Sequence, residues 1–471
     1  MNMFTRLRPL LVALWVFGLS GCDATADRPV VVQFWAMGQE GEQVKALLPE
    51  FERRHPTIRV RVQQLPWSAA HEKLLTAYAG DALPDLFQLG NTWIPEFVAL
   101  RALEPLDGRL RAWPESALAD YFPGILATNR IEGQTWALPW YVDTRLFFYR
   151  SDLLAAAGFA EPPDTWDDWL RAMTALKAAG GSVRYAILLP INEWQLPVIL
   201  ALQNGALLLR DHDQYGNFQD PRFREAFLFY LSLFERGLAP PVGNTQMANL
   251  YQEFANGVFA VYVSGPWNIG EFGRRLPAAL QDQWMTAPLP EFTEATSRPP
   301  AGETAEARVG ASLAGGASLA LNRTSPRREA AWKLLEFLAE PEQQAHFYQL
   351  TGDLPARQSA WKDPALADNR YAQAFREQLR QVKATPPIPE WERIANKLAY
   401  HAERTIRGQV SADEALAALD RDVDRILEKR RWLLSREKQP SPPAPLPPAG
   451  EGSEQPSPPA PGSPAGEGSE R

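Results

Sequence analysis

The chain has 471 residues, of which 45% are hydrophobic and 22% are charged, the composition of a globular protein long enough for two or more domains. A formal net charge of -8, without any cluster of basic residues, argues against a nucleic acid as partner. Cys22 is the single cysteine, so an intramolecular disulfide and a cysteine-based metal centre are excluded, and with only 5 histidines we expect no metal and no other cofactor.

The first 22 residues have the pattern of a secretory signal peptide. Arg6 and Arg8 supply a positive start, and residues 10–19 form an apolar run that is too short to span a bilayer comfortably. Leu19-Ser20-Gly21-Cys22 then resembles the lipobox of bacterial lipoproteins, in which the cysteine becomes the lipidated first residue. We therefore expect residues 1–22 to be a signal peptide and Cys22 to carry lipid, palmitate included. The exported protein would be anchored to the outer face of the cytoplasmic membrane, in the periplasm or at the cell surface; a plain signal peptide is the alternative.

Strands and helices alternate from residue 30 onward, which is the rhythm of an α/β fold. The patterns predict strands over residues 30–35, 58–64 and 86–89 and helices over residues 41–54 and 71–79. A second series has strands over residues 146–149, 185–189 and 258–263 and helices over residues 222–235, 246–255 and 328–338. Thr165-Trp-Asp-Asp168 and Ser411-Ala-Asp-Glu414 have the form of capping boxes, and the second opens a last helix that ends near Arg431.

Residues 439–471 differ from the rest of the chain in composition. Pro, Ala, Gly, Ser and Glu dominate this segment, and Leu446 is its only large aliphatic residue. Such a segment buries too little apolar surface to offset its chain entropy, so we expect a disordered, proline-rich tail.

Several stretches, taken in order, resemble the extracellular solute-binding proteins of the maltose-binding type. They are Leu83-Pro-Asp-Leu-Phe87, Trp136-Ala-Leu-Pro-Trp140-Tyr-Val-Asp143, Phe254-Ala-Asn-Gly-Val-Phe-Ala260, Ser264-Gly-Pro-Trp267, Ala330-Ala-Trp-Lys-Leu-Leu-Glu-Phe-Leu338 and Gly352-Asp-Leu-Pro-Ala-Arg357. The likeness extends over roughly residues 30–430, and the ordered series is more specific than any single motif.

The resemblance implies a periplasmic-binding-protein type II fold, in which two α/β lobes are joined by hinge crossovers. One lobe would comprise residues 28–141 plus about 289–349, and the other about 142–288 plus 350–432. It also implies a monomeric protein without enzymatic activity, the substrate-binding component of a bacterial ABC importer. Such a protein captures a mono-, di- or oligosaccharide in the cleft between its lobes, closes about its hinges, and delivers the sugar to the permease subunits.

A sugar site needs flat aromatic surfaces for the C–H-rich faces of the ring and planar polar groups for the hydroxyls. Loops beyond the carboxyl ends of strands, together with the positions that match ligand contacts of the family, indicate one set of candidates. These are Trp35, Gln39, Glu40, Asn91, Thr92, Trp93, Asp143, Asn192, Trp194, Trp267, Gly315, Gly316 and Arg357. Thr92 occupies a family position where an aspartate often binds a sugar hydroxyl, and this departure weakens the expectation of a maltose-like ligand.

Each candidate has a structural alternative. Tryptophans near strands are more often core residues than ligand platforms. Trp267 follows a Ser-Gly-Pro turn, which favours the platform, whereas for Trp194 both interpretations stay open. Arg357 either holds vicinal hydroxyls or pairs with an acid across the hinge. We assign three other tryptophans to the core, Trp136, Trp166 and Trp332.

Other functions stay open at this point. A secreted glycosidase would also display tryptophans and carboxylates, but the sequence has no clear pair of acids, no Gly-x-Ser-x-Gly elbow and no His-Glu-x-x-His helix. A binder of glycerol phosphate or another polar solute would need basic side chains at the ligand, and Arg145 and Arg357 could supply them. A sensory or scaffold lipoprotein that kept the fold is a further alternative.

Overall fold

The computed structural model describes residues 28–247, 249–292 and 309–437. The predicted signal peptide with Cys22 and the tail over residues 439–471 lie outside the described residues. The chain divides into one compact unit that ends at Leu427 and another that begins at Glu428, of which helix α20 (Glu428–Glu437) is described. None of the described helices has the combination of length and hydropathy that is needed to cross a membrane.

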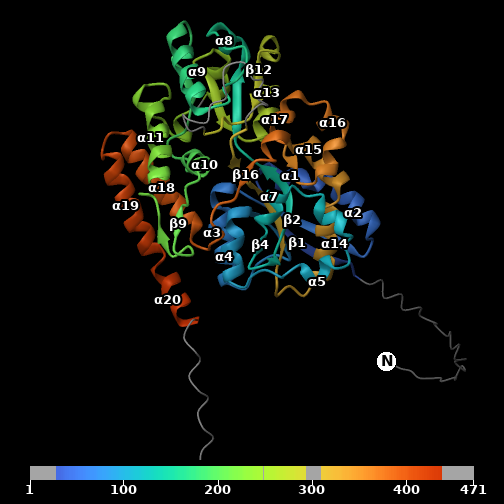
Figure 1. Cartoon of the computed structure of the whole chain (residues 1–471). Coiled ribbons are helices and arrows are strands. Elements are labelled where there is room, and N and C mark those ends of the chain that lie inside the picture. The colour runs from blue at the N-terminus through green and yellow to red at the C-terminus, as the bar shows by residue number, and fades with distance from the viewer. Residues whose placement is uncertain (1–27, 248, 293–308, 438–471) are drawn as a thin grey trace, which may run out of the picture. The chain divides into compact units, whose positions relative to one another are not determined.

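A six-stranded sheet organises the first lobe (Figure 1). The strand order is β15-β6-β14-β3-β1-β2, and β1 pairs in parallel with β2 and β3, while β14 runs antiparallel to β3 and β6. The strands are β1 (Val30–Met37), β2 (Ile58–Leu65), β3 (Leu86–Gly90), β6 (Leu138–Asp143), β14 (Gly315–Leu321) and β15 (Leu354–Pro355).

Helices cover both faces of this sheet because successive side chains of a strand point to opposite faces. On β1, Val32 and Phe34 enter a core shared with α2, α14 and α15, whereas Met37 enters a second core shared with α3 and α4. The helices are α1 (Gly38–Gln43), α2 (Leu48–Arg54), α3 (Trp67–Ala79), α4 (Ile94–Ala99), α14 (Arg328–Leu338) and α15 (Pro341–Thr351).

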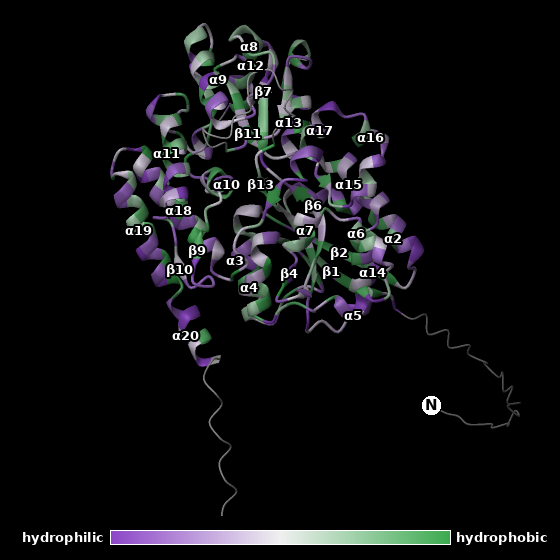
Figure 2. Ribbon diagram, viewed as in Figure 1, coloured by the Kyte–Doolittle hydropathy of each residue, from purple (hydrophilic) through white to green (hydrophobic). Residues whose placement is uncertain are grey.

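The second lobe is built on a four-stranded sheet of order β12-β7-β11-β8. Phe147 and Phe148, neighbours on β7, enter two different hydrophobic clusters, so this sheet is also covered on both faces. Figure 2 shows apolar residues along β7 and polar residues on the helices α18 and α19. The strands are β7 (Leu146–Arg150), β8 (Tyr185–Leu188), β11 (Phe259–Ser264) and β12 (Trp284–Ala287), and the helices are α8 (Ser151–Ala156), α9 (Trp166–Ala179), α10 (Gln195–Gln203), α11 (Pro221–Glu235), α12 (Leu250–Ala255), α13 (Trp267–Arg275), α17 (Arg370–Gln378), α18 (Trp391–Ile406) and α19 (Ala412–Ile426).

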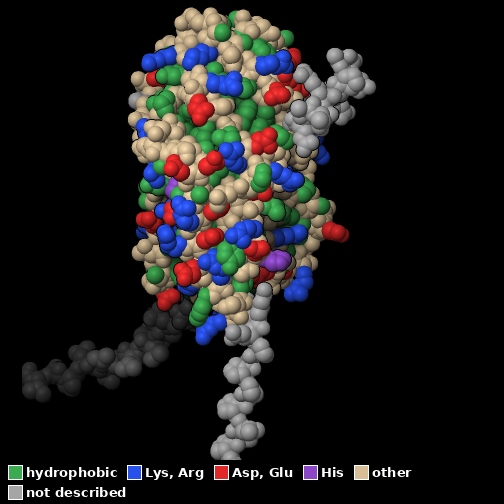
Figure 3. Space-filling view, turned by 60° about the vertical axis from the view of Figure 1, so that its left-hand side comes forward, with side chains coloured by type: hydrophobic (Ala, Val, Ile, Leu, Met, Phe, Trp, Pro, Cys, Tyr) green, Lys and Arg blue, Asp and Glu red, His purple; other side chains and the backbone are tan. Residues whose placement is uncertain are grey.

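Short elements complete the described part of the chain. They are α5 (Asp107–Leu110), α6 (Glu115–Ala119), α7 (Pro123–Ala127), α16 (Pro364–Ala367), the strand pairs β4 (Arg130–Ile131) with β5 (Gln134–Thr135), β9 (Leu209–Arg210) with β10 (Tyr215–Gly216) and β13 (Ser312–Leu313) with β16 (Val382–Lys383), and the 3-10 turns η1 (Val44–Ala46), η2 (Asn91–Trp93), η3 (Asn244–Gln246), η4 (Ala278–Leu280) and η5 (Gln358–Lys362). On the face drawn in Figure 3, Lys and Arg alternate with Asp and Glu, and no extended patch of one sign forms there.

The chain crosses between the lobes at places that differ in part from the expected ones. The first crossing is Thr144–Arg145, between β6 and β7, and the chain returns between β12 and β14. The third crossing, expected near Leu350, comes later, because β15 is an edge strand of the first sheet and α17 packs on β12 of the second. The second lobe also ends earlier than residue 432, since a separate unit begins at Glu428.

Most predicted elements are present, and the largest differences in their bounds are in four helices, one of which, α3, begins at Trp67 instead of residue 71. The helix expected over residues 41–54 is two helices, because a 3-10 turn intervenes and Pro49 starts α2 in the first-turn position that proline favours. The helix expected from residue 246 begins at Leu250, and the last predicted helix ends at Ile426. Both helix starts marked by capping residues are confirmed, since Thr165 accepts from the Asp168 amide and Ser411 forms a full capping box with Glu414.

Candidate ligand-binding site

A cavity of about 700 Å³ lies between the lobes, within the size range of small-molecule sites. Its wall is made by the segments that follow the strands β1, β3, β6 and β11, together with residues from α10, α12, α13 and α18. Ten of the candidates from the sequence line it, namely Gln39, Glu40, Asn91, Thr92, Trp93, Asp143, Trp194, Trp267, Gly315 and Gly316.

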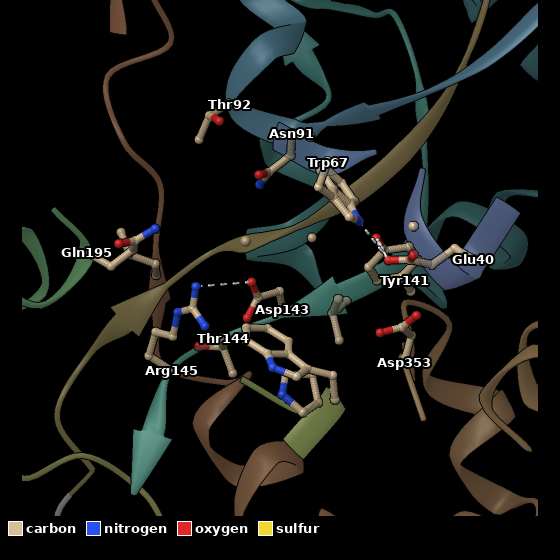
Figure 4. Close-up of a pocket in the computed structure, with 18 of the residues that line it drawn as sticks. Glu40, Trp67, Asn91, Thr92, Tyr141, Asp143, Thr144, Arg145, Gln195 and Asp353 are labelled. Atoms are coloured by element: carbon tan, nitrogen blue, oxygen red, sulfur yellow. Dashed lines mark hydrogen bonds and ion pairs between the residues drawn. The ribbon is translucent and has the colours of Figure 1, made fainter. Parts of the chain in front are cut away.

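Glu40 is held by a chain of hydrogen bonds that begins in the core of the first lobe (Figure 4). Its Oε1 accepts from the Trp67 indole N–H at 3.2 Å and from the Tyr141 hydroxyl at 2.9 Å. The Gln88 amide donates to the same hydroxyl at 2.9 Å, while the Gln88 carbonyl accepts from the Met37 amide at 2.8 Å. Both side-chain donors to Glu40 use Oε1, and the backbone at Glu40 also hydrogen-bonds this carboxylate. A carboxylate has about four acceptor sites, so the group keeps capacity for a ligand.

Asp353 is a second buried carboxyl at the cavity, only 4% exposed, on the same side as Glu40 in Figure 4. Its Oδ2 accepts no hydrogen bond within the described part of the chain. Burial, and next the charge of Glu40, raise the pKa of Asp353 well above its ordinary value, and burial likewise raises the pKa of Glu40. Burial therefore opposes ionisation of both carboxyls, and the donors Trp67 and Tyr141 offset part of this effect at Glu40.

Asp143 and Arg145 flank the first crossing beside Trp267. The Arg145 guanidinium lies 3.8 Å from the Asp143 carboxylate and 4.7 Å from the centre of the Trp267 ring, a cation–π distance. Asp143 Oδ1 is buried without a partner among the described residues, and burial raises the pKa of this carboxyl. A methyl group on Gly265 would lie 2.0 Å from the Trp267 ring and 2.7 Å from Asp143 Oδ1, so the ring rests directly on the glycine backbone.

The two predicted glycines, Gly315 and Gly316, line the cavity, but the packing around them already explains why glycine is needed at both positions. A methyl group on Gly315 would lie 2.6 Å from the Asp143 carbonyl oxygen. Gly316 has φ +137°, and a methyl group there would lie 2.3 Å from the Tyr141 carbonyl oxygen. Close pairing of β14 with β6 therefore requires glycine at both positions, whether or not a ligand approaches.

Three predicted site residues lie outside the cavity. Arg357 is 7% exposed and donates to Asp120 at 2.8 Å, so it has an acid partner in the fold, and its contact with a ligand stays a prediction that its place outside the cavity wall does not favour. Trp35 is half-buried against the core that includes α3 and α4, because its β1 side chain points to that face of the sheet rather than beyond the strand end. Asn192 is exposed and accepts from the Asn244 amide at 2.9 Å.

The cavity also contains residues that the sequence did not single out. Tyr141 stands within the stretch that carries the resemblance, and its place just before Asp143 was the available signal. Asp353 likewise stands within a quoted stretch, Gly352-Asp-Leu-Pro-Ala-Arg357. Other polar and aromatic residues of the wall come from segments with no site motif: Trp67, Thr144, Gln195, Tyr251, Glu271, Arg275, Thr385 and Glu392. Across the described residues, no cluster of three or more His, Cys, Asp or Glu is arranged to hold a metal ion.

The three tryptophans that were assigned to the core all pack against hydrophobic cores of the fold. Trp166 and Trp332 are 5% and 7% exposed, and Trp136 packs, half-buried, against the core that includes α3 and α4. Trp194, for which both interpretations were open, lines the cavity and stacks edge-on against the buried Trp391, with ring centres 5.4 Å apart.

Comparison with known proteins places the chain among binding proteins. The family described as "Bacterial extracellular solute-binding protein" matches residues 36–345. A solved structure of the sugar-binding protein MalE from Xanthomonas citri is similar at a TM-score of 0.80 and 47% sequence identity, covering 87% of this chain and 100% of that chain. The diacetylchitobiose binding protein DasA of Streptomyces coelicolor is 26% identical over 409 residues, which are 84% of this chain and 89% of that protein. The galactooligosaccharide-binding protein of Bacillus subtilis is 22% identical over 389 residues, 81% and 86% of the two proteins.

The family match extends over well over half of the chain, and the solved relative has the two-lobed fold that the strand orders describe here. The expected α/β fold of the periplasmic-binding-protein type II class is thereby confirmed. The chain belongs to the family of bacterial extracellular solute-binding proteins.

Proposed function

We propose that this protein is the substrate-binding component of a bacterial ABC importer and that its ligand is a sugar. The cavity carries the proposal, because it lies between two lobes joined by short crossings and combines indole rings with carboxylates in one wall. Relatives named for binding sugars, diacetylchitobiose and galactooligosaccharides support the same ligand class.

The lining suits the two surfaces of a sugar. Indole rings such as those of Trp67, Trp93 and Trp267 can pack on C–H-rich faces. The unpartnered Oδ2 of Asp353 and the remaining acceptor capacity of Glu40 can accept from hydroxyls. Arg145 covers one face of Trp267, so we expect the sugar to stack on the opposite face. Because a cavity of about 700 Å³ suits a drug-sized ligand, we propose a disaccharide or a longer sugar.

The charges at the cavity disfavour the alternative of glycerol phosphate. Both of its arginines already have acid partners, since Arg145 lies near Asp143 and Arg275 contacts Glu271 at 2.6 Å. A phosphate ester would have to enter a wall in which acids outnumber bases, and every acid of this wall that is ionised repels it in a site of low dielectric. The acids of the wall are Glu40, Asp143, Glu271, Asp353 and Glu392.

We propose that the sugar leaves chemically unchanged. A glycosidase places its two carboxyl groups on opposite sides of the scissile bond. The relatives are named as binding proteins, which supports release of the sugar unchanged, and the two neighbouring carboxyls Glu40 and Asp353 lie on one side of the cavity (Figure 4) rather than on both sides of a ligand.

We propose further that the mature chain is a monomer, lipid-anchored through Cys22 at the outer face of the cytoplasmic membrane, where it meets the permease subunits. The lipobox-like residues 19–22 support this location. Cys22→Ser should move the protein from the membrane fraction to the soluble fraction of cells, and an unchanged distribution would contradict the anchor.

Binding of the sugar is tested by thermal unfolding with a panel of mono-, di- and oligosaccharides, with glycerol 3-phosphate as the competing ligand. A sugar that binds only the native state raises the melting temperature by mass action, and calorimetry should then give a Kd of about 1 μM, which is about 8 kcal/mol. If glycerol 3-phosphate raises the melting temperature and no sugar does, the ligand is a phosphate ester and the proposed sugar is wrong. A new product, detected by chromatography after incubation, would make the protein an enzyme.

A further inference from the structure

The cavity is closed on one side by a contact between the lobes. Thr92, in the 3-10 turn after β3, donates its hydroxyl proton to Glu392 Oε1 at 2.5 Å. Glu392 lies in the first turn of α18, whose residues Ile394 and Leu398 are buried with Phe147 in the second lobe. The hydrogen bond therefore exists only when the two lobes are together.

Glu392 is part of the cavity wall, and only one of its oxygens is occupied by the protein. Oε1 accepts from Thr92, whereas Oε2 receives no hydrogen bond from any described residue. The Thr92 hydroxyl has a single proton, which is used for Glu392, so Thr92 can offer a ligand no donor of its own. Burial is the main cause that raises the pKa of Glu392, whereas the hydrogen bond from Thr92 and the charge of His71 lower it. His71 in turn contacts Glu96 at 2.6 Å, and the charge of Glu96 raises the pKa of Glu392 slightly.

The carboxylate of Glu392 lies in a different part of the cavity wall from those of Glu40 and Asp353. Thr92 lies away from the group formed by Glu40, Tyr141 and Asp353 in Figure 4. A ligand bound to Glu40 and Asp353 would thus find no further carboxylate on the Thr92 side of the first lobe. Glu392, brought there by the second lobe, supplies a carboxylate acceptor on that side.

We infer that Glu392 is a ligand-binding residue which is assembled by lobe closure, and that Thr92 is the positioning residue which orients it. Its Oε2 accepts a hydroxyl of the bound sugar while Thr92 holds Oε1. The inference rests on the proposed function, because it takes a hydroxyl-rich ligand as given. The family resemblance predicts an acidic acceptor at position 92 of the first lobe. In this protein the acceptor would instead come from the second lobe, as Glu392.

The test uses the full-length mature chain with the tightest sugar of the panel. Glu392→Gln keeps the shape of the side chain and should raise the Kd roughly tenfold or more, since hydrogen bonds to charged groups are the stronger class. Thr92→Val keeps the volume, removes the donor, and should raise the Kd about three- to tenfold. Most of each change should appear in the dissociation rate measured by stopped-flow fluorescence, because the contact forms after closure.

The double variant distinguishes positioning from two separate contacts. If Thr92 acts through Glu392, Glu392→Gln with Thr92→Val should weaken binding little more than Glu392→Gln alone. If the Kd of the double variant instead rises by the product of the two single-variant factors, the positioning role of Thr92 is wrong. If Glu392→Gln binds with wild-type affinity, the ligand contact of Glu392 is wrong. Glu403→Gln, on the same helix but paired with Arg407, is the matched control and should bind like wild type. If wild-type protein binds no sugar, the proposed function fails; if it binds and Glu392→Gln binds equally well, this inference alone fails.

Discussion

Gly265 offers the sharpest test of the aromatic platform, because the Trp267 ring rests on it. A Cβ atom at this position would lie 2.0 Å from Cζ3 and 2.4 Å from Cη2 of the indole. Since carbon atoms pack at about 3.5–4.0 Å, Gly265→Ala should displace the ring by about 1.5 Å or more.

The displacement should weaken ligand binding without removing the tryptophan. A shift of this size takes away most of a stacked contact, which is worth on the order of 1–2 kcal/mol by buried area. The Kd should therefore rise about 5- to 30-fold. Trp267→Ala, which removes the whole ring, should weaken binding by at least as much.

Titration calorimetry with the best sugar, supported by thermal unfolding of each variant, measures the effect. Gly273→Ala is the matched control, since Gly273 lies on the same helix α13 and a methyl group there would meet no atom within 4 Å. Wild-type affinity for a folded Gly265→Ala variant would show that Trp267 is not a ligand surface, and the reasoning from the glycine contact would be refuted.

Three other perturbations address the carboxylates and the fold. The pKa of Asp353 is raised in the folded state by burial, so its contribution to stability is complete below the unfolded pKa and is lost as the pH rises through the folded one. Asp353→Asn should thus raise the melting temperature of the ligand-free protein at about pH 8 but hardly at about pH 4, and an equal effect at both would contradict the raised pKa. Tyr141→Phe removes one donor to Glu40 and should raise the Kd for sugar roughly three- to tenfold in calorimetry. An unchanged Kd would argue against a contact between Glu40 and the ligand. Asp85→Ala removes the buried acceptor of the Gln33 backbone amide at 2.7 Å and of the Ser325 hydroxyl at 2.6 Å, and should lower the unfolding free energy in urea by about 1–3 kcal/mol while leaving the Kd unchanged, because Asp85 is not in the cavity wall; a shifted Kd would argue against this purely structural role.

The site residues that could be predicted are those next to the end of a strand. Glu40 follows β1, Asn91 to Trp93 follow β3, and Trp267 follows β11 closely. Sheet geometry brings such loops together at one edge, so chain order and strand pattern are sufficient to find them. Asp353 and Glu392 follow or begin helices, and nothing in a helical pattern says which end faces a cavity.

Arg357 shows the opposite case. Its place in a family-like motif predicted a ligand contact, yet a nearby carboxylate, Asp120, lies within hydrogen-bond distance of it in the fold. The position of a residue in a motif predicts its approximate location in the fold. Its charge partner depends on which side chains the packing brings within a few ångströms of it.

The order of strands and helices, the α/β class and the membership of a family were thus determined by the sequence alone, because local hydrophobic periodicity and motif order persist without any knowledge of distant contacts. The place of the third crossing, the hydrogen-bond chain from Gln88 to Glu40, and the meeting of Thr92 with Glu392 were decided only by the tertiary structure. Thr92 and Glu392 are 300 residues apart in the chain, and only the packing of α18 in the second lobe brings the carboxylate to the first.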